Sequence, residues 1–205
     1  MTSNEIKKII EKNFESIIPE NFRIKNNIFY YVPIIDFVKG FCFEKSKNEE
    51  NSLYVWSFVQ PLFVPNDTIS LSFGKRLGNR LWTLKGNDVI QSDIIDLSIL
   101  MKNEVVNFFA DIDSNNKFYN FYENECKNIR MVEALVYSAI YSQNKNAELI
   151  LNNFINNLQN EDLSIKWIGT ILQKMQHLKL ILNDKDKLDT LFKANIKYTK
   201  VNIGL

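Results

Sequence analysis

The spacing of apolar residues along the chain follows two regimes, and the change between them lies close to Gly86. Before that point, apolar and polar residues tend to alternate, which is the two-residue repeat of β-strands. After it, apolar residues recur every three or four positions, as on one face of an α-helix. A first helix precedes both regimes: residues 2–5 fit a capping box with Thr2 or Ser3 as the cap, helical spacing runs from Ile6 to Ile17, and Pro19 is expected to end the helix.

Several extended runs between Phe22 and Leu84 predict strands. The run 53–59 has apolar residues on both sides, which indicates a central strand covered on both faces. The run 68–73 alternates most cleanly and predicts a strand with one buried and one wet face. Gly40 is interpreted as a possible bulge. Because no helix-length connection separates these runs, they predict an antiparallel meander.

Two prolines interrupt the β-type pattern, and helices are predicted beyond residue 87. Pro61 and Pro65 bracket a short apolar piece and place it at an edge of the sheet or outside it, since proline cannot donate to a ladder. Farther along, the apolar stripes of residues 129–158 predict an αα-hairpin, and Asp184 is expected to cap the last helix.

These patterns together predict an α+β fold. An N-terminal helix and an antiparallel β-meander of four to six strands occupy residues 1–86, and an all-helical half packed on the sheet occupies residues 87–205. The first long helix after this boundary is expected to cover the apolar face of the sheet, so that the two parts share one core.

Composition and charge indicate an ordinary globular protein. The chain has 205 residues, 45% hydrophobic and 24% charged, with a net charge of +1, so nothing global attracts it to nucleic acid or to an acidic membrane. Acidic residues gather in 88–125, and lysines dominate from residue 166 onward. We interpret these segments as two solvated helix surfaces; segments that face each other, or that mark opposite poles, are the alternatives.

The sequence also predicts a cytoplasmic location. Its start lacks the apolar core of a signal peptide, and no apolar stretch approaches the roughly 18–20 residues that span a bilayer. Cys42 and Cys126 are expected to be free thiols in a reducing cytosol, with a bridge between them as the alternative. The abundance of Asn, Lys and Ile indicates an AT-rich bacterial genome.

A cationic segment is the predicted polar contact site. Lys75, Arg76 and Arg80 lie among two glycines, and such a loop holds an anion through backbone N–H groups and guanidinium forks. It is not a P-loop, because the Gly-Lys-Ser/Thr ending before a helix is missing. A positively charged hairpin turn is the alternative.

Aromatic residues on one side of the central strand form a second candidate. Tyr54 and Trp56, with Phe58, would make a platform for a peptide, a sugar or single-stranded nucleic acid, and core beneath a helix is the alternative. The low net basicity counts against nucleic acid. The residues predicted to contact a ligand or partner are therefore Lys75, Arg76, Arg80, Tyr54 and Trp56.

Other candidate sites lack residues that their chemistry requires. Residues 111–115 start like a calcium loop, but the Gly and the bidentate Glu of such a loop are missing, and a capped loop between helices is expected instead. The single histidine, His177, is expected on a helix surface or partly packed. Acid pairs such as Asp93 and Asp96 are expected to be solvated helix acids. We predict no catalytic residue, no metal site and no cofactor.

Two functions from different classes remain. The first is a non-catalytic protein-binding module, such as a toxin-neutralising immunity protein or an adaptor; the segregated charge, the solvent-facing strand surface and the lack of active-site motifs favour it. The second is an enzyme with a phosphate-ester- or glycan-directed site near Arg76, Arg80 and the acidic loop, which requires these groups to converge in a deep pocket. We favour the first.

Overall fold

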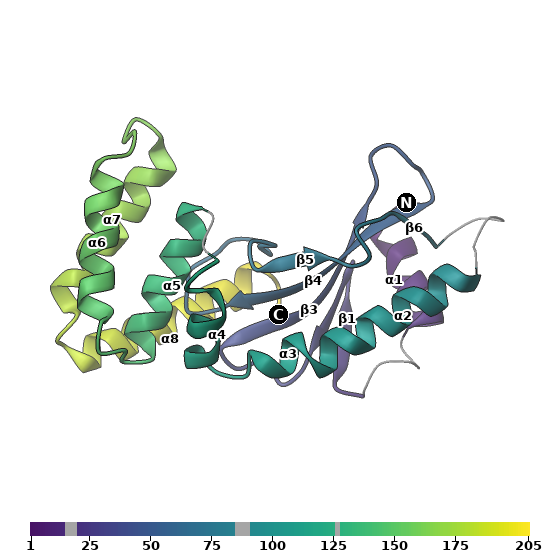
Figure 1. Ribbon diagram of the computed structural model, residues 1–205, viewed down its shortest axis with the longest axis horizontal. Helices are drawn as coiled ribbons and strands as arrows, with labels where there is room; N and C mark the ends of the chain where they lie inside the picture. Colours follow the sequence, from purple (N-terminus) through teal and green to yellow (C-terminus); the bar gives the residue numbers. More distant parts are fainter. Residues whose placement is uncertain (15–19, 85–90, 126–127) are drawn as a thin grey trace. The chain divides into compact units, whose positions relative to one another are not determined.

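The computed structural model describes residues 1–14, 20–84, 91–125 and 128–205 (Figure 1). They form two compact units. The sheet unit comprises residues 1–60 and 70–111, and the helical unit comprises residues 61–69 and 112–205. The division predicted at residue 86 falls within 85–90, outside the described residues, and stays a prediction.

The sheet unit contains an N-terminal helix, a sheet and two further helices, as the labels in Figure 1 show. In the described residues the sheet has six strands in the order β1-β2-β3-β4-β5, with β6 also paired to β4, and the pairs β1–β2, β2–β3, β4–β5 and β4–β6 are antiparallel. The predicted fold class, a helix and an antiparallel sheet followed by helices, is confirmed. The elements are α1 (Ser3–Asn13), β1 (Phe22–Lys25), β2 (Ile28–Tyr31), β3 (Phe37–Lys45), β4 (Ser52–Pro61), β5 (Gly74–Arg76), β6 (Trp82–Thr83), α2 (Gln91–Val106) and α3 (Phe108–Asp111).

The beginning of α1 follows directly from its sequence. The Thr2 hydroxyl accepts a hydrogen bond from the Glu5 backbone N–H, and the Glu5 carboxylate accepts one from the Thr2 backbone N–H at 2.7 Å. This reciprocal pair satisfies donors that a helix start otherwise leaves open. The predicted capping box is confirmed, whereas Pro19 lies outside the described residues.

The helices of the sheet unit contact one face of the sheet. Phe14, at the end of α1, packs against Phe43, with the ring centroids 5.8 Å apart. Phe109 of α3 packs against Phe41 on the same strand at 5.3 Å. The Ser57 hydroxyl of β4 donates to the Glu104 carboxylate of α2 at 2.9 Å. Side chains alternate between the two faces along a strand, so the residues next to these in each strand point to the other face. Tyr54, Trp56 and Arg76 are among them.

The predicted central position of β4 is confirmed, but one predicted strand is wrong. The run Thr68–Phe73 is not a strand. The strand that pairs with β4 here is β5, which begins at Gly74, directly after that run. Gly40 is the register partner of Tyr30 in the last pair of the β2–β3 ladder, and the predicted bulge stays a prediction. The two strands approach closely at this position, where a Cβ atom would lie 2.8 Å from the Tyr30 Cα.

The failure of the 68–73 prediction has a tertiary cause. The chain leaves the sheet at the prolines and returns to β4 only when the Val59 N–H donates to the Phe73 carbonyl at 3.0 Å. Before that, the Ser70 backbone N–H donates to the Gln60 side chain at 2.8 Å and not to a strand. Alternation by itself does not create a ladder where no strand lies beside the run to pair with it.

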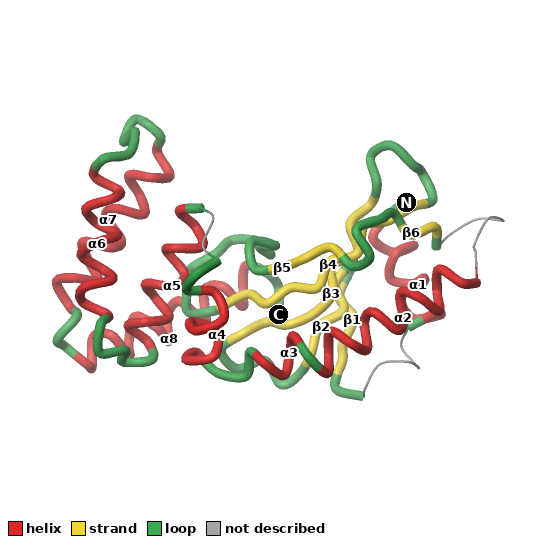
Figure 2. The backbone as a smooth tube through the Cα atoms, viewed as in Figure 1, coloured by secondary structure: helices red, strands yellow, loops and turns green. Residues whose placement is uncertain are grey.

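The helical unit is a succession of helices in which each packs against the next in the sequence, as Figure 2 shows for α5, α6 and α7. The predicted αα-hairpin is α5 followed by α6, and the predicted cap is confirmed, since Asp184 accepts from the Lys187 backbone N–H at 3.1 Å. No helix in the described ranges is long and apolar enough to cross a bilayer. The elements are α4 (Asn115–Tyr122), α5 (Ile129–Tyr141), α6 (Ala147–Gln159), α7 (Lys166–Ile181) and α8 (Lys185–Asn202).

The segment Pro61–Ile69 belongs to the helical unit although it begins at the last residue of β4. Leu62, Phe63 and Val64 are buried, so their backbone groups need partners. Helix α8 supplies these partners. The buried Asn195 side chain donates to the Phe63 carbonyl at 3.0 Å, and the buried Thr199 hydroxyl donates to the Val64 carbonyl at 3.1 Å.

Thr199 also accepts a hydrogen bond from the Asn66 backbone N–H at 3.1 Å, so that one hydroxyl serves two backbone groups. We therefore expect Thr199→Val to lower the free energy of unfolding by about 1–3 kcal/mol, since both groups lose their partner. Urea denaturation followed by circular dichroism measures this. Thr190→Val on the exposed side of α8 is the matched control and should cost less than about 0.5 kcal/mol. Equal stability of the two variants would contradict this account of the segment.

Gly40 and Gly169 offer a second matched pair. Gly40→Ala places a methyl group against the β2 backbone and should lower the free energy of unfolding by about 2–3 kcal/mol. Gly169→Ala lies in α7, where the nearest atom is 3.9 Å away, and should raise it by about 0.5–1 kcal/mol through helix propensity. Thermal unfolding compares the two, and a stable Gly40→Ala protein would refute the close approach of β2 and β3.

Candidate binding site on the sheet

Arg76 and Trp56 face each other across the β4–β5 ladder. They are register partners, so their side chains lie on the same face of the sheet, and Tyr54 is two residues away on that face. The Arg76 guanidinium carbon lies 4.0 Å from the centre of the Tyr54 ring and 4.8 Å from that of Trp56. We call these three side chains the Arg76 cluster.

The guanidinium of the Arg76 cluster is exposed, whereas both rings are half-buried. No carboxylate in the described part of the chain forms an ion pair with Arg76. Its contacts are with aromatic faces, which hold the guanidinium by cation–π attraction and limit its rotamers. The cluster therefore presents an oriented set of N–H donors, the arrangement that binds carboxylate or phosphate through paired hydrogen bonds.

Glu44 on β3 completes the surroundings of the cluster. Its carboxylate accepts a hydrogen bond from the Trp56 indole N–H at 2.9 Å. The bond fixes the indole plane on which Arg76 lies, because a tryptophan with a satisfied N–H has fewer orientations. The sequence reasoning missed Glu44. The signals that point to it are the Trp56 N–H, which needs an acceptor, and the two-residue repeat that places Cys42 and Glu44 on one face of β3.

The other predicted contact residues lie elsewhere. Lys75 is the register partner of Ser57 and therefore points to the helix face of the sheet. There its ammonium lies 3.0 Å from the Glu104 carboxylate of α2 and over the Phe108 ring. The two adjacent cations Lys75 and Arg76 are thus on opposite faces, as strand geometry requires.

Arg80 forms ion pairs with α2. Its guanidinium lies 3.1 Å from Asp93 and 3.2 Å from Asp96, and it covers the Trp82 ring at 4.1 Å. Asp93, predicted to be solvated, is buried and also accepts from the Thr83 backbone N–H at 3.3 Å. Arg80 thus joins the segment between β5 and β6 to α2 and neutralises a buried carboxylate. The structure groups Tyr54, Trp56 and Arg76, and it separates Lys75 and Arg80 from them.

The remaining sequence candidates are accounted for by local contacts. The Ser114 hydroxyl caps α4, and Asp113 lies 2.7 Å from the Lys117 ammonium, four residues along. His177 is exposed on α7. Among the residues that the structure describes, no group of three or more His, Cys, Asp or Glu side chains has a metal-binding arrangement. Within the sheet unit, Arg76 and Arg80 do not converge, because Arg76 lies on aromatic rings and Arg80 on carboxylates of α2.

Comparison with protein-family models, with curated proteins and with solved structures finds no match for this chain. The arrangement of its own side chains therefore carries the functional argument.

Cys42 adjoins the cluster on β3 and gives a test of the burial of this part of the sheet. Burial, with a smaller contribution from the Glu44 charge, raises the pKa of its thiol to about 11 from 9.0. At pH 8, below both values, the reactive thiolate is about 100-fold scarcer in the folded protein.

We expect iodoacetamide to alkylate Cys42 at pH 8 at least about 100-fold more slowly in the native protein than in urea. Peptide mass spectrometry distinguishes this site from Cys126, which lies outside the described residues. Raising the pH toward 11 should accelerate the native reaction as the thiolate forms. Equal rates in native and unfolded protein would show that β3 is accessible at this position.

Proposed function

We propose that the protein is a non-catalytic protein-binding module that recognises an acidic group of its partner through the Arg76 cluster. The observation that carries the proposal is an exposed guanidinium stacked on two aromatic rings without a carboxylate partner among the described residues. An arginine held in this way loses little conformational freedom when it forms paired hydrogen bonds, so binding costs less entropy.

The composition of the cluster favours a protein partner. Trp, Tyr and Arg are the residues most enriched among those that dominate the free energy of protein–protein binding. Half-buried rings provide apolar area at the centre of such a contact, and the guanidinium provides specificity for charge. A carboxylate from an Asp or Glu side chain of the partner is the ligand that fits best.

The biological form we propose is a toxin-neutralising immunity protein or an adaptor in the cytoplasm of a bacterium. Both kinds of protein act by occupying a surface of another protein, and neither needs a reaction centre. The Asn-, Lys- and Ile-rich composition supports the bacterial assignment. In an immunity protein, an arginine such as Arg76 would cover an acidic region of the toxin.

The test is a partner-capture experiment with matched variants. Protein recovered on the immobilised chain is identified by mass spectrometry, purified, and titrated calorimetrically against each variant. Arg76→Ala should weaken binding at least about 30-fold, corresponding to a hot-spot loss of about 2 kcal/mol, and Trp56→Ala should weaken it comparably. Arg76→Lys should restore only part of the affinity, because an ammonium does not form the paired bonds.

Trp167→Ala serves as the control, since Trp167 is also a partly exposed tryptophan covered by an arginine, at 5.1 Å, but belongs to the helical unit. The affinity of Trp167→Ala for the partner should stay within about twofold of that of the unaltered chain. If Arg76→Ala and Trp56→Ala bind the partner as tightly as Trp167→Ala does, the Arg76 cluster is not the contact surface and the proposal fails.

A further inference from the structure

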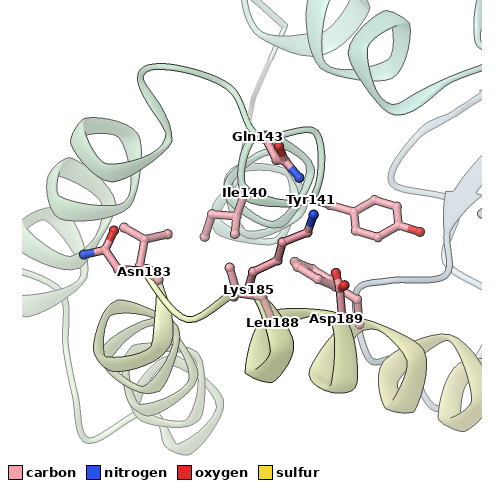
Figure 3. Close-up of a pocket in the computed structure, with 9 residues that line it drawn as sticks. Ile140, Tyr141, Gln143, Asn183, Lys185, Leu188 and Asp189 are labelled. Carbon is pink, nitrogen blue, oxygen red and sulfur yellow. The ribbon is translucent and has the colours of Figure 1, made fainter.

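The helical unit holds a pocket that the Arg76 cluster does not involve. It lies between the end of α5 and the beginning of α8 (Figure 3) and has a volume of about 250 Å³. Apolar side chains, among them Ile140, Leu188 and Phe192, form its walls, and Lys185 and Asp189 are at its rim. The volume is below the roughly 300–1,000 Å³ of most small-molecule sites and suits one large side chain of a protein.

The pocket shares two aromatic walls with a contact that the chain already makes. Tyr141 and Phe192 line the pocket, and both rings also pack on Phe63, at centroid distances of 5.1 and 6.4 Å. Phe63 belongs to the segment whose carbonyl groups are bound by Asn195 and Thr199 of α8. The helical unit therefore already binds a Phe-containing segment on these walls.

The rim charges indicate which residues flank the ligand's side chain. Lys185 and Asp189 are exposed, four residues apart on α8, and Figure 3 shows both at the mouth of the pocket. Neither forms an ion pair with any side chain in the described ranges. One exposed cation and one exposed anion remain available to opposite charges on a bound segment.

We infer that this pocket binds an aromatic side chain from a segment of a partner protein, in which the aromatic residue lies between an acidic and a basic residue. The aromatic ring packs against Tyr141 and Phe192 as Phe63 does on the same walls. Lys185 contacts the acid of the segment, and Asp189 contacts its base. The contact is independent of the proposed function of the sheet unit.

Three blocked peptides test the inference with the full chain: Ac-Ser-Glu-Phe-Lys-Ser-NH2, its charge-reversed form Ac-Ser-Lys-Phe-Glu-Ser-NH2, and Ac-Ser-Glu-Ala-Lys-Ser-NH2. Titration is followed by amide chemical shifts in NMR spectra. The Phe peptides should shift the amides of Gln143, Asn183 and Leu188, and the Ala peptide should bind at least about tenfold more weakly, since one buried aromatic side chain is lost. Absence of saturable shifts with either Phe peptide overturns the inference.

The charges are tested by reversing them. One order of Glu and Lys should bind about threefold more tightly, as expected for exposed ion pairs. The double variant Lys185→Glu/Asp189→Lys should invert that preference while the Phe-over-Ala preference persists. A preference that does not invert, or two orders that bind equally, overturns the assignment of the rim residues.

A pocket-filling variant localises the binding. Leu188→Phe extends a half-buried side chain into the cavity and should weaken the Phe peptides at least about tenfold, whereas Leu180→Phe, at a position 84% exposed, should not. Arg76→Ala should leave peptide binding unchanged, so failure here is distinguishable from failure of the proposed function. If Leu188→Phe binds as well as the unaltered chain, the peptides bind elsewhere and the inference is wrong.

Discussion

The need to satisfy buried backbone groups after β4 governs much of the structure. At Pro61 the chain leaves the ladder, and the following apolar residues become buried in the helical unit. Buried carbonyl and N–H groups without partners cost free energy comparable to several hydrogen bonds, so burial here requires acceptors and donors from outside the segment. The Asn195 and Thr199 side chains of α8 meet that requirement. Helix α8 thus binds the segment Pro61–Ile69 of its own chain.

This arrangement has consequences at both ends of the segment. On the sheet side, the ladder beside β4 resumes only at Gly74, which leaves β5 short and places Arg76 opposite Trp56. On the helical side, Phe63 packs on Tyr141 and Phe192, the same rings that form walls of the pocket. Both candidate contact surfaces are therefore shaped by how these few residues bury their side chains and bond their backbone.

The cations of β5 and of the segment that follows it show how the face of the sheet and the neighbouring residues decide what a charge does. Lys75 and Arg80 are bound to carboxylates of α2, so their charge stabilises the attachment of that helix. Arg76, one residue from Lys75, points to the other face and lies on aromatic rings. An arginine on aromatic rings keeps its hydrogen-bonding capacity for another molecule, whereas an arginine between two carboxylates has already used much of it.

The sequence by itself determined the α+β class, the capping of α1 and α8, the αα-hairpin of α5 and α6, and the central position of β4, because caps and apolar periodicity act over a few residues. It also selected Tyr54, Trp56 and Arg76 as contact residues, although their role stays a prediction. Only the tertiary structure decided that 68–73 is not a strand, that Lys75 and Arg76 lie on opposite faces, and that Asp93 is buried against Arg80. These outcomes depend on register and on partners distant in the sequence. The pocket between α5 and α8 is of the same kind, since its walls come from helices about fifty residues apart, and no local pattern encodes that meeting.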